Sequence, residues 1–361
     1  MTAKPRLLTG DTPTGRLHIG HYVGSVENRL ALQDEYDCFF LIANKHAFTT
    51  RADKPADIRQ SVLDIATDWL ACGIDPQKSA MFVQSEIPAI DELTFFLSML
   101  IPFNRVMRNP TLKDEIRDKD LGDNYPFGFP LYAVGQCADI LAFRPALVPV
   151  GEDQIPHLEM TREVARRFDQ LYCGVDPQTE DHLYTMKGGL FPIIEPKLGR
   201  VRRLVGIGPP APEGNLQKMS KSLNNAIFLS DDAATVEKKV RGMYTDPKRL
   251  RATDPGTIEN NPLWIFQETF NPDKAWIAEH EEAYRQGKVG DVIIKKKLTE
   301  VLNALIEPIR TRRKHFEDRP DDVISALRQG TQRANAVAEE TLYLAKQAMK
   351  QDYFGPRHLS F

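Results

Sequence analysis

Two histidines near the start of the chain are the first residues whose types and spacing indicate chemistry. His18 and His21 follow a glycine-containing loop at residues 9–15, and an apolar pair, Leu7 and Leu8, precedes that loop. The pattern predicts a strand, a loop and a helix, with both imidazoles on one face of the first helical turn. A helix N-terminus favours phosphate oxygens, and the imidazoles could donate hydrogen bonds to a phosphoryl group in transfer. A capped surface turn, or part of a metal site, is the alternative.

A second segment, in the middle of the chain, could act on the same phosphates. Its residues are Lys218-Met219-Ser220-Lys221-Ser222. Glycine and proline are frequent in the preceding residues 206–215, so the segment is predicted to lie in a loop. Two ammonium groups and two hydroxyls can close over a triphosphate and hold its oxygens. Taken alone, the segment is equally consistent with a solvated basic loop.

The ordered pair of segments resembles the two signatures of the class I aminoacyl-tRNA synthetases, named HIGH and KMSKS after such strings. The resemblance extends from about Thr9 to the C-terminal helices. It implies that the chain activates an amino acid with magnesium-bound ATP and transfers it to a tRNA. His18, His21, Lys218 and Lys221 are then the expected catalytic residues, which would act by position and charge rather than as covalent nucleophiles.

Three segments between the signatures resemble the tryptophanyl branch of this class more than the tyrosyl branch. They are VQSEIP at 83–88, ADIL at 138–141 and VPVGEDQ at 148–154. The resemblance implies L-tryptophan, ATP with Mg²⁺, and tRNA(Trp) as the substrates, and a homodimer as the assembly. Four residues depart from the common pattern of the branch and indicate a divergent or auxiliary subgroup. They are Thr12, His21, Asn44 and Gln136, where the branch commonly has Gln, Asn, Asp and Met.

Asp139 is the residue that the resemblance assigns to the indole N–H of tryptophan. It interrupts an apolar helical run at residues 138–143, so its carboxylate could point into the interior, where it would need a partner. A pocket that leaves such a group unpaired rejects analogues by roughly 10⁴- to 10⁵-fold. Judged without the resemblance, a solvent-facing aspartate on an amphipathic helix is the alternative.

Two further sets of contacts are expected from the resemblance, except that Tyr132 and Gln136 are expected as pocket walls from their helical spacing. The other expected tryptophan contacts are His46, Tyr132, Gln136 and Gln154. The expected ATP contacts are Thr12, Pro13, Thr14, Gly20, His21, Gly151, Glu152, Asp153, Val201, Lys218, Met219, Ser220, Lys221 and Ser222. Helical spacing predicts that Tyr132, Gln136 and Asp139 share a face. Without the resemblance, residues 151–154 could simply begin a capped helix, and His46 could be structural.

The rhythm of the sequence predicts how these residues are positioned. Short apolar segments at 7–8, 38–43, 80–83 and 146–150 alternate with helical patterns. This favours an α/β fold, a Rossmann-like doubly wound parallel sheet, as the catalytic domain over residues 1–225. A charged and then Pro- and Gly-rich stretch near 105–130 is expected as an insertion.

Residues 226–361 are expected to form a C-terminal helical domain that binds the tRNA anticodon. An apolar stripe that includes Leu298, Leu302 and Ile306 has helical spacing. Basic residues lie at 238–251, 295–297 and 310–314 and could contact phosphates, although such runs are often solvated faces.

Composition sets the remaining expectations. The chain has 361 residues, 42% of them hydrophobic, and a formal net charge of −3, so an RNA site must be a local patch. Its four cysteines include no C-x-x-C pair, which argues against structural zinc and disulfides and for a reducing compartment. With no long apolar stretch, we expect a cytoplasmic protein without a cleaved signal or a membrane span.

Three other functions stay open from the sequence. A tyrosine-specific synthetase is disfavoured by the segments at 138–141 and 148–154. A nucleotidyltransferase of another pathway would share the histidine motif but lack the lysine motif and the basic helical region. A non-catalytic paralogue or tryptophan sensor is disfavoured by the intact histidines and lysines.

Overall fold

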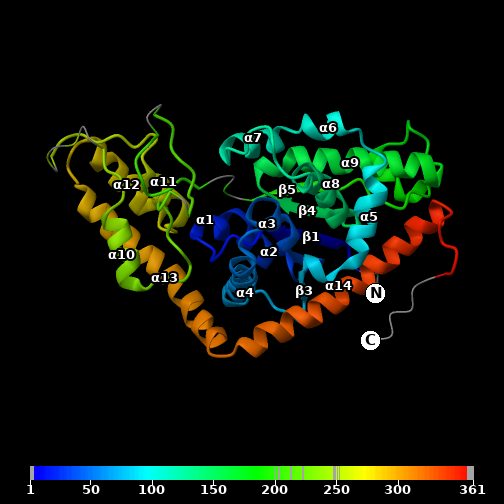
Figure 1. Cartoon of the computed structure of the whole chain (residues 1–361). Coiled ribbons are helices and arrows are strands. Elements are labelled where there is room, and N and C mark those ends of the chain that lie inside the picture. The colour runs from blue at the N-terminus through cyan, green and yellow to red at the C-terminus, as the bar shows by residue number, and fades with distance from the viewer. Residues whose placement is uncertain are drawn as a thin grey trace.

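The structure is a computed structural model that describes residues 4–199, 201, 204–211, 214–221, 223–246, 249, 251 and 253–355. These residues form a five-stranded parallel sheet in the order β3-β2-β1-β4-β5 (Figure 1). The strands are β1 (Arg6–Asp11), β2 (Asp37–Ile42), β3 (Ser79–Val83), β4 (Leu147–Val150) and β5 (Glu195–Leu198). The expected Rossmann-like class is confirmed, because the strand order reverses at β1 as in doubly wound folds.

The fifth strand is the one that the apolar pattern does not predict. The four apolar segments correspond to β1 to β4, whereas β5 has the sequence EPKL and is buried at none of its residues. Its position at the edge of the sheet explains this composition, because an edge strand tolerates proline and needs no continuous apolar run.

Helices connect and cover the strands. In the first half they are α1 (Ile19–His21), α2 (Glu27–Leu32), α3 (Asn44–Arg51), α4 (Pro55–Cys72), α5 (Pro88–Ser98), α6 (Phe103–Met107), α7 (Pro110–Asp118), α8 (Gly128–Leu141) and α9 (Ile155–Phe168). In the second half they are α10 (Ala233–Arg241), α11 (Pro262–Phe270), α12 (Lys274–Arg285), α13 (Asp291–Glu317) and α14 (Pro320–Ala348). Short turns at Tyr22–Val26, Gln84–Glu86 and Glu152–Gln154 link some of them to their neighbours.

Two apolar clusters cover the two faces of the sheet. Along β2, Phe40 and Ile42 belong to one cluster, and Phe39 and Leu41 belong to the other, because successive side chains of a strand point to opposite faces. The first cluster also contains residues of α4, α10, α11 and α13, so it continues from the sheet into the C-terminal helices. The second cluster is covered by α5, α8, α9 and part of α14.

The last helix, α14, returns to the sheet and lies against β3 (Figure 1). Gly330 faces the backbone of Met81 so closely that a β-carbon would overlap the Met81 carbonyl oxygen. Asn335 Nδ2 donates to the Glu86 carbonyl at 2.7 Å. None of the helices in the described part of the chain has the length and apolarity of a membrane span.

A crevice forms where β1 and β4 separate. These strands share a single paired position, Leu7 with Leu147, and from there β1 continues to Asp11 while β4 continues to Val150. The Thr9 hydroxyl donates to the Pro149 carbonyl at 2.7 Å and ties the two strands at the base of the opening. Ligands of open α/β sheets bind at such a point, beyond the carboxyl ends of the strands.

Candidate active site

The two histidines lie together at the start of α1. Their ring centroids are 3.7 Å apart, and the His18 backbone N–H donates to His21 Nδ1 at 3.1 Å. This bond places the ring proton of a neutral His21 on Nε2, where it is available to a ligand. Burial lowers the pKa of His18 to about 2 and that of His21 to about 4, so both imidazoles are neutral at pH 7. The expectation that they share a face is confirmed.

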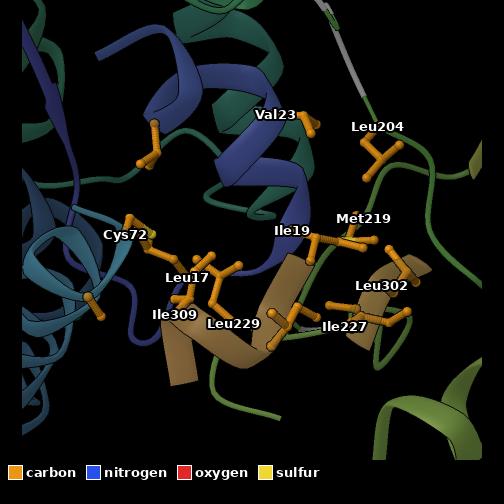
Figure 2. Packing of buried hydrophobic residues seen from close by; sticks show 14 of the residues in the cluster. Leu17, Ile19, Val23, Cys72, Leu204, Met219, Ile227, Leu229, Leu302 and Ile309 are labelled. Atoms are coloured by element: carbon orange, nitrogen blue, oxygen red, sulfur yellow. The ribbon is translucent and has the colours of Figure 1, made fainter. Parts of the chain in front are cut away.

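The segment that carries the histidines is paired with the segment that follows the lysine loop. The Leu229 N–H donates to the Leu17 carbonyl, and the Ile19 N–H donates to the Ile227 carbonyl, both at 3.0 Å. The side chains of these four residues pack with Met219 and with Leu302 of α13, among others (Figure 2). Two segments far apart in the sequence are therefore held side by side.

The lysine loop folds beside the glycine-containing loop after β1. Lys221 Nζ donates to the Thr14 hydroxyl at 3.3 Å, and burial lowers the pKa of Lys221 to about 8. Asn225, which the sequence does not single out, holds the loop: its Nδ2 donates to the Lys218 carbonyl at 3.1 Å and its Oδ1 accepts from the Ser220 N–H at 2.7 Å. Ser222, an expected ATP contact, lies outside the described residues.

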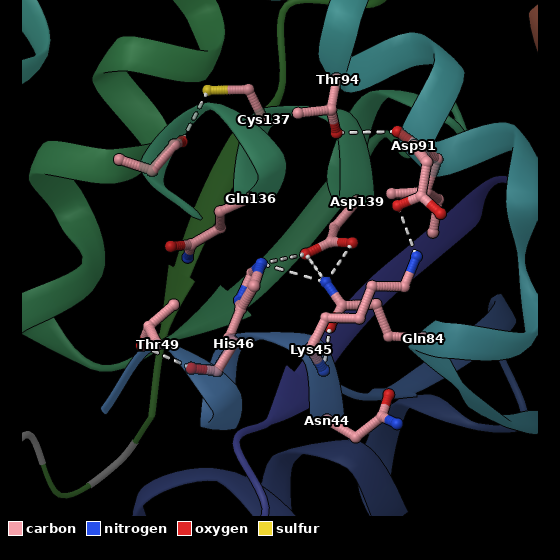
Figure 3. A network of polar contacts seen from close by, with 12 residues as sticks. Asn44, Lys45, His46, Thr49, Gln84, Asp91, Thr94, Gln136, Cys137 and Asp139 are labelled. Atoms are coloured by element: carbon pink, nitrogen blue, oxygen red, sulfur yellow. Dashed lines mark hydrogen bonds and ion pairs between the residues drawn. The ribbon is translucent and has the colours of Figure 1, made fainter. Parts of the chain in front are cut away.

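Asp139 is almost completely buried, so the solvent-facing alternative is wrong. Gln84 Nε2 donates to both of its carboxylate oxygens, at 2.8 and 2.9 Å (Figure 3). The Lys45 N–H donates to Gln84 Oε1 at 3.0 Å, which orients that amide toward Asp139. His46 Nε2 lies 3.3 Å from Asp139 Oδ2. Burial raises the pKa of Asp139 to about 7, and the Gln84 hydrogen bonds oppose the rise.

Gln84 is a site residue to which its sequence context assigns no role. It follows β3 directly, at the carboxyl end of a buried parallel strand. That position was the available signal, since polar residues at this edge of a sheet are placed to meet ligands. His46, which follows the apolar segment at 38–43, lies in the first turn of α3. The helix carries its ring toward Asp139 (Figure 3).

Tyr132, Gln136 and Asp139 all project from α8 into one cavity, which confirms that they share a face. Gln136 Nε2 donates to Gln154 Oε1 at 3.1 Å. The Tyr132 hydroxyl donates to Glu115 of α7 at 3.1 Å, so the expected insertion at 105–130 contributes a wall. The sequence offered no signal for Glu115, one of several charges on an amphipathic helix.

The cavity has a volume of about 530 Å³ and extends from Asp139 to His21 and the loop after β1, whereas His18 is not in its lining. Its lining includes Thr12, Thr14, Gly20, His21, His46, Tyr132, Gln136, Asp139, Gly151, Asp153 and Gln154. Among the described residues, the expected ATP contacts outside this lining are Pro13, Glu152, Val201, Lys218, Met219, Ser220 and Lys221. Pro13 is buried, Met219 belongs to the apolar core, and Glu152 is exposed in the turn after β4.

A buried ion pair supports the histidine side of the cavity. Arg29 is fully buried, and its guanidinium lies 2.9 Å from Asp11 Oδ2. Trp69 Nε1 donates to the same oxygen at 3.1 Å, and Arg29 lies over the Trp69 ring at 4.9 Å. The Asp11 charge opposes the fall in the pKa of His21. Asp11 is the last residue of β1 rather than part of the loop expected at residues 9–15, and the sequence did not predict this role.

Several basic residues of α13 are used within the protein. Lys295 Nζ donates to two carbonyl oxygens near the end of α10, at 2.9 and 2.7 Å. Arg310 donates to the Asp231 carbonyl at 2.7 Å, and the buried Arg313 pairs with Asp68. These three side chains are therefore not the free phosphate contacts that the charge pattern predicted. Exposed lysines of α10 and α13 include Lys238, Lys296 and Lys314.

The fold and the paired loops define a class of enzyme that handles the phosphates of a nucleotide at the switch point of a doubly wound sheet. The sequence model of the tRNA synthetases class I (W and Y) matches residues 1–307, and the chain belongs to this family. It is 42% identical over 358 residues to the tryptophan–tRNA ligase of Clostridium longisporum, covering 98% of each chain. It is 45% identical over 350 residues to the tryptophan–tRNA ligase of Treponema pallidum, covering 95% of this chain and 96% of that one.

Solved structures agree with this assignment. The tryptophanyl-tRNA synthetase of Campylobacter jejuni, in complex with ADP and tryptophan, superimposes with a TM-score of 0.78 at 29% identity. The match covers 96% of this chain and 99% of that one. Sequence and fold therefore place the chain in the same family.

Proposed function

We propose that the chain is a tryptophan–tRNA ligase. It activates L-tryptophan with Mg-ATP to tryptophanyl-adenylate and pyrophosphate, and then transfers the acyl group to the 3′ end of tRNA(Trp). The observation that carries the proposal is that one cavity joins the buried carboxylate of Asp139 to His21 and the loop after β1. The relatives named above, and the Campylobacter jejuni complex with ADP and tryptophan, support it.

In the first step, the tryptophan carboxylate attacks the α-phosphorus of ATP and pyrophosphate leaves. The neutral imidazoles of His18 and His21 hold the reacting phosphoryl group by hydrogen bonds, so no proton transfer is required. Lys218 and Lys221 hold the departing pyrophosphate, and Mg²⁺ arrives with ATP as part of the substrate. The enzyme contributes position and charge stabilisation.

Asp139 selects the amino acid. Its two oxygens already accept from Gln84, and each retains a lone pair that can accept the indole N–H. Phenylalanine would leave the carboxylate without that donor. Tyr132, Gln136 and Gln154 form the pocket around the amino acid.

The proposed assembly is a homodimer. Three exposed apolar side chains support it: Phe95 at 64%, Met99 at 65% and Phe103 at 60% exposure. Phe95 lies in α5, Met99 caps the C-terminus of this helix four residues later, and Phe103 begins α6, so we infer that they form one apolar patch. Such a patch marks an interaction surface more often than a solvated face. We further propose that the exposed lysines of the C-terminal helices contact tRNA(Trp).

Exchange of labelled pyrophosphate into ATP tests the proposal. We expect exchange with tryptophan and none with tyrosine or phenylalanine. Exchange driven by tyrosine would show that the amino-acid substrate is tyrosine rather than tryptophan. No exchange with any amino acid would contradict ligase activity. Charging of purified tRNA(Trp) with labelled tryptophan tests the second step.

A further inference from the structure

A buried aspartate of α4 holds the backbone next to the first catalytic histidine. Asp68 is fully buried, and its Oδ2 accepts from the Leu17 N–H at 2.7 Å. Leu17 directly precedes His18. Three hydrogen bonds from other segments therefore hold residues 17–19: two come from the segment after the lysine loop, and the third comes from Asp68.

The other oxygen of Asp68 pairs with Arg313, which comes from α13 in the C-terminal half of the chain. Arg313 is buried as well, and it is held by Glu317 at 3.0 Å and Asp64 at 3.7 Å. Arg312 Nε adds a hydrogen bond to the Ala71 carbonyl at 2.6 Å. Helix α13 is thus joined to α4 beside the residue that supports the histidine segment.

The buried pair of Asp68 and Arg313 is unfavourable for the stability of the fold unless it serves to position another group. Two buried charges lose their hydration, and a pair of apolar side chains of similar volume would often be as stable or more stable. Burial raises the pKa of Asp68 to about 6, and the guanidinium of Arg313 opposes that rise. An apolar pair would, however, leave the Leu17 N–H without an acceptor.

We infer that Asp68 is a positioning residue for His18, and that Arg313 orients Asp68 from α13. The C-terminal helices thereby help to set the geometry of the phosphate-binding turn. This inference rests on the proposed function, because His18 is assigned there to the phosphoryl group. The inference adds that α13 acts on His18 through a series of contacts, from Arg313 to Asp68 and from Asp68 to the Leu17 backbone.

Two double variants separate positioning from stability. Asp68→Leu with Arg313→Met replaces the ion pair by apolar side chains and removes the acceptor. Asp68→Asn with Arg313→Met also removes both charges but keeps a side-chain oxygen for the Leu17 N–H. The variants are to be compared by kcat and KM in tryptophan-dependent pyrophosphate exchange, per active site titrated by adenylate formation.

We expect the leucine variant to lose kcat by roughly 10- to 100-fold, because displacing a catalytic group by 1 Å can cost about 10²-fold. The KM for tryptophan should stay unchanged, since the Asp139 end of the cavity is untouched. The asparagine variant should retain the kcat of the unmodified chain. Equal kcat values in the two double variants would overturn the inference.

A control variant breaks another ion pair between a C-terminal helix and the sheet. Arg333→Met breaks the ion pair between Arg333 of α14 and Asp37 of β2, which also joins a C-terminal helix to the sheet but touches none of residues 17–19. Its kcat should be unchanged. A loss of kcat equal to that of the leucine variant would show that any broken ion pair of this kind slows the enzyme, and would overturn the inference.

Amide hydrogen exchange keeps the inference independent of the proposed function. The Leu17 amide should be protected in the unmodified chain and in the asparagine variant, and should exchange faster in the leucine variant. If the unmodified chain showed no pyrophosphate exchange, the proposed function would fail while this measurement still stood. Should the leucine variant not fold, Asp68→Ala and Asp68→Asn, each measured per titrated active site, make the same comparison. Equal Leu17 protection in either pair would overturn the inference.

Discussion

At the scale of single residues, the site combines neutral donors with one buried acceptor. His18 and His21 are uncharged at pH 7, so in the proposed mechanism they would offer hydrogen bonds rather than charge to the phosphoryl group. Lys221 places a positive charge beside Thr14, and the hydrogen bond from Gln84 orients the carboxylate of Asp139. The proposal therefore assigns phosphate handling and amino-acid choice to different residues, which predicts that the two can be perturbed separately.

Replacing Asp139 by alanine should separate the two ligands. A hydrogen bond to a charged group contributes about 1.5–3 kcal/mol, so the KM for tryptophan should rise by roughly 10- to 100-fold while the KM for ATP changes little. Steady-state pyrophosphate exchange measures both constants. Asp91→Ala is a suitable control, because Asp91 is a largely exposed carboxylate that pairs with Lys45 on the same side of the sheet. Equal rises in both KM values would contradict the assigned role.

The lowered pKa of Lys221 predicts a dependence on pH. Burial favours the uncharged amine, and the pKa is about 8, so the ammonium is present below pH 8 and is lost as the pH rises through that value. The KM for ATP should therefore increase above pH 8. Lys221→Arg should remove this increase, since a guanidinium stays charged throughout the range. An unchanged pH profile in the arginine variant would exclude Lys221 as the titrating group.

At the scale of elements, the site depends on where strands separate and where helices return. The opening between β1 and β4 creates the cavity, α7 closes one wall, and α14 supports β3 from outside. Four of the five strands follow from apolar runs in the sequence. The return of α14 to β3 does not, because an amphipathic stripe shows that one face is buried but not which partner covers it.

The contact between α14 and β3 gives a prediction about stability. Gly330→Ala would drive a β-carbon into the Met81 carbonyl, so α14 must shift, and the free energy of unfolding should fall by about 3 kcal/mol. Urea denaturation followed by circular dichroism measures the change. Gly128→Ala in α8 is the matched control, because a β-carbon there meets no atom within 4 Å. If both variants unfold at the same urea concentration, the close packing of α14 is not required.

At the scale of the whole molecule, the C-terminal helices are not an independent appendage. One apolar cluster runs from the sheet through α4 to α13, and α14 packs against β3. A movement of these helices would therefore reach the histidine segment. Helix α5, which carries part of the apolar patch proposed as the dimer interface, also contacts α14.

Charging that patch should dissociate the proposed homodimer. Phe95→Glu combined with Met99→Glu would place two carboxylates in the interface, where their desolvation is unfavourable. Sedimentation velocity should show a dimer for the unmodified chain and a monomer for the double variant. Val292→Glu, at an exposed position of α13, is the control and should leave the assembly unchanged. A dimer that survives the double substitution would place the interface elsewhere.

The sequence by itself determined the residues that act within one turn or one loop. His18 and His21 are three residues apart at the start of a helix, so their spacing alone predicts that the two rings share a face. The motif at 218–222 likewise marks Lys218 and Lys221, although distant residues hold both segments in place. Helical spacing also predicts that Tyr132, Gln136 and Asp139 share one face of α8.

Only the tertiary structure decided which groups hold these residues. Gln84 beside Asp139, and Asp68 beside Leu17, are separated from their partners by 55 and 51 positions in the chain. A polar residue in a sequence carries no mark of the distant group it will meet. Its burial becomes favourable only when the fold supplies that partner.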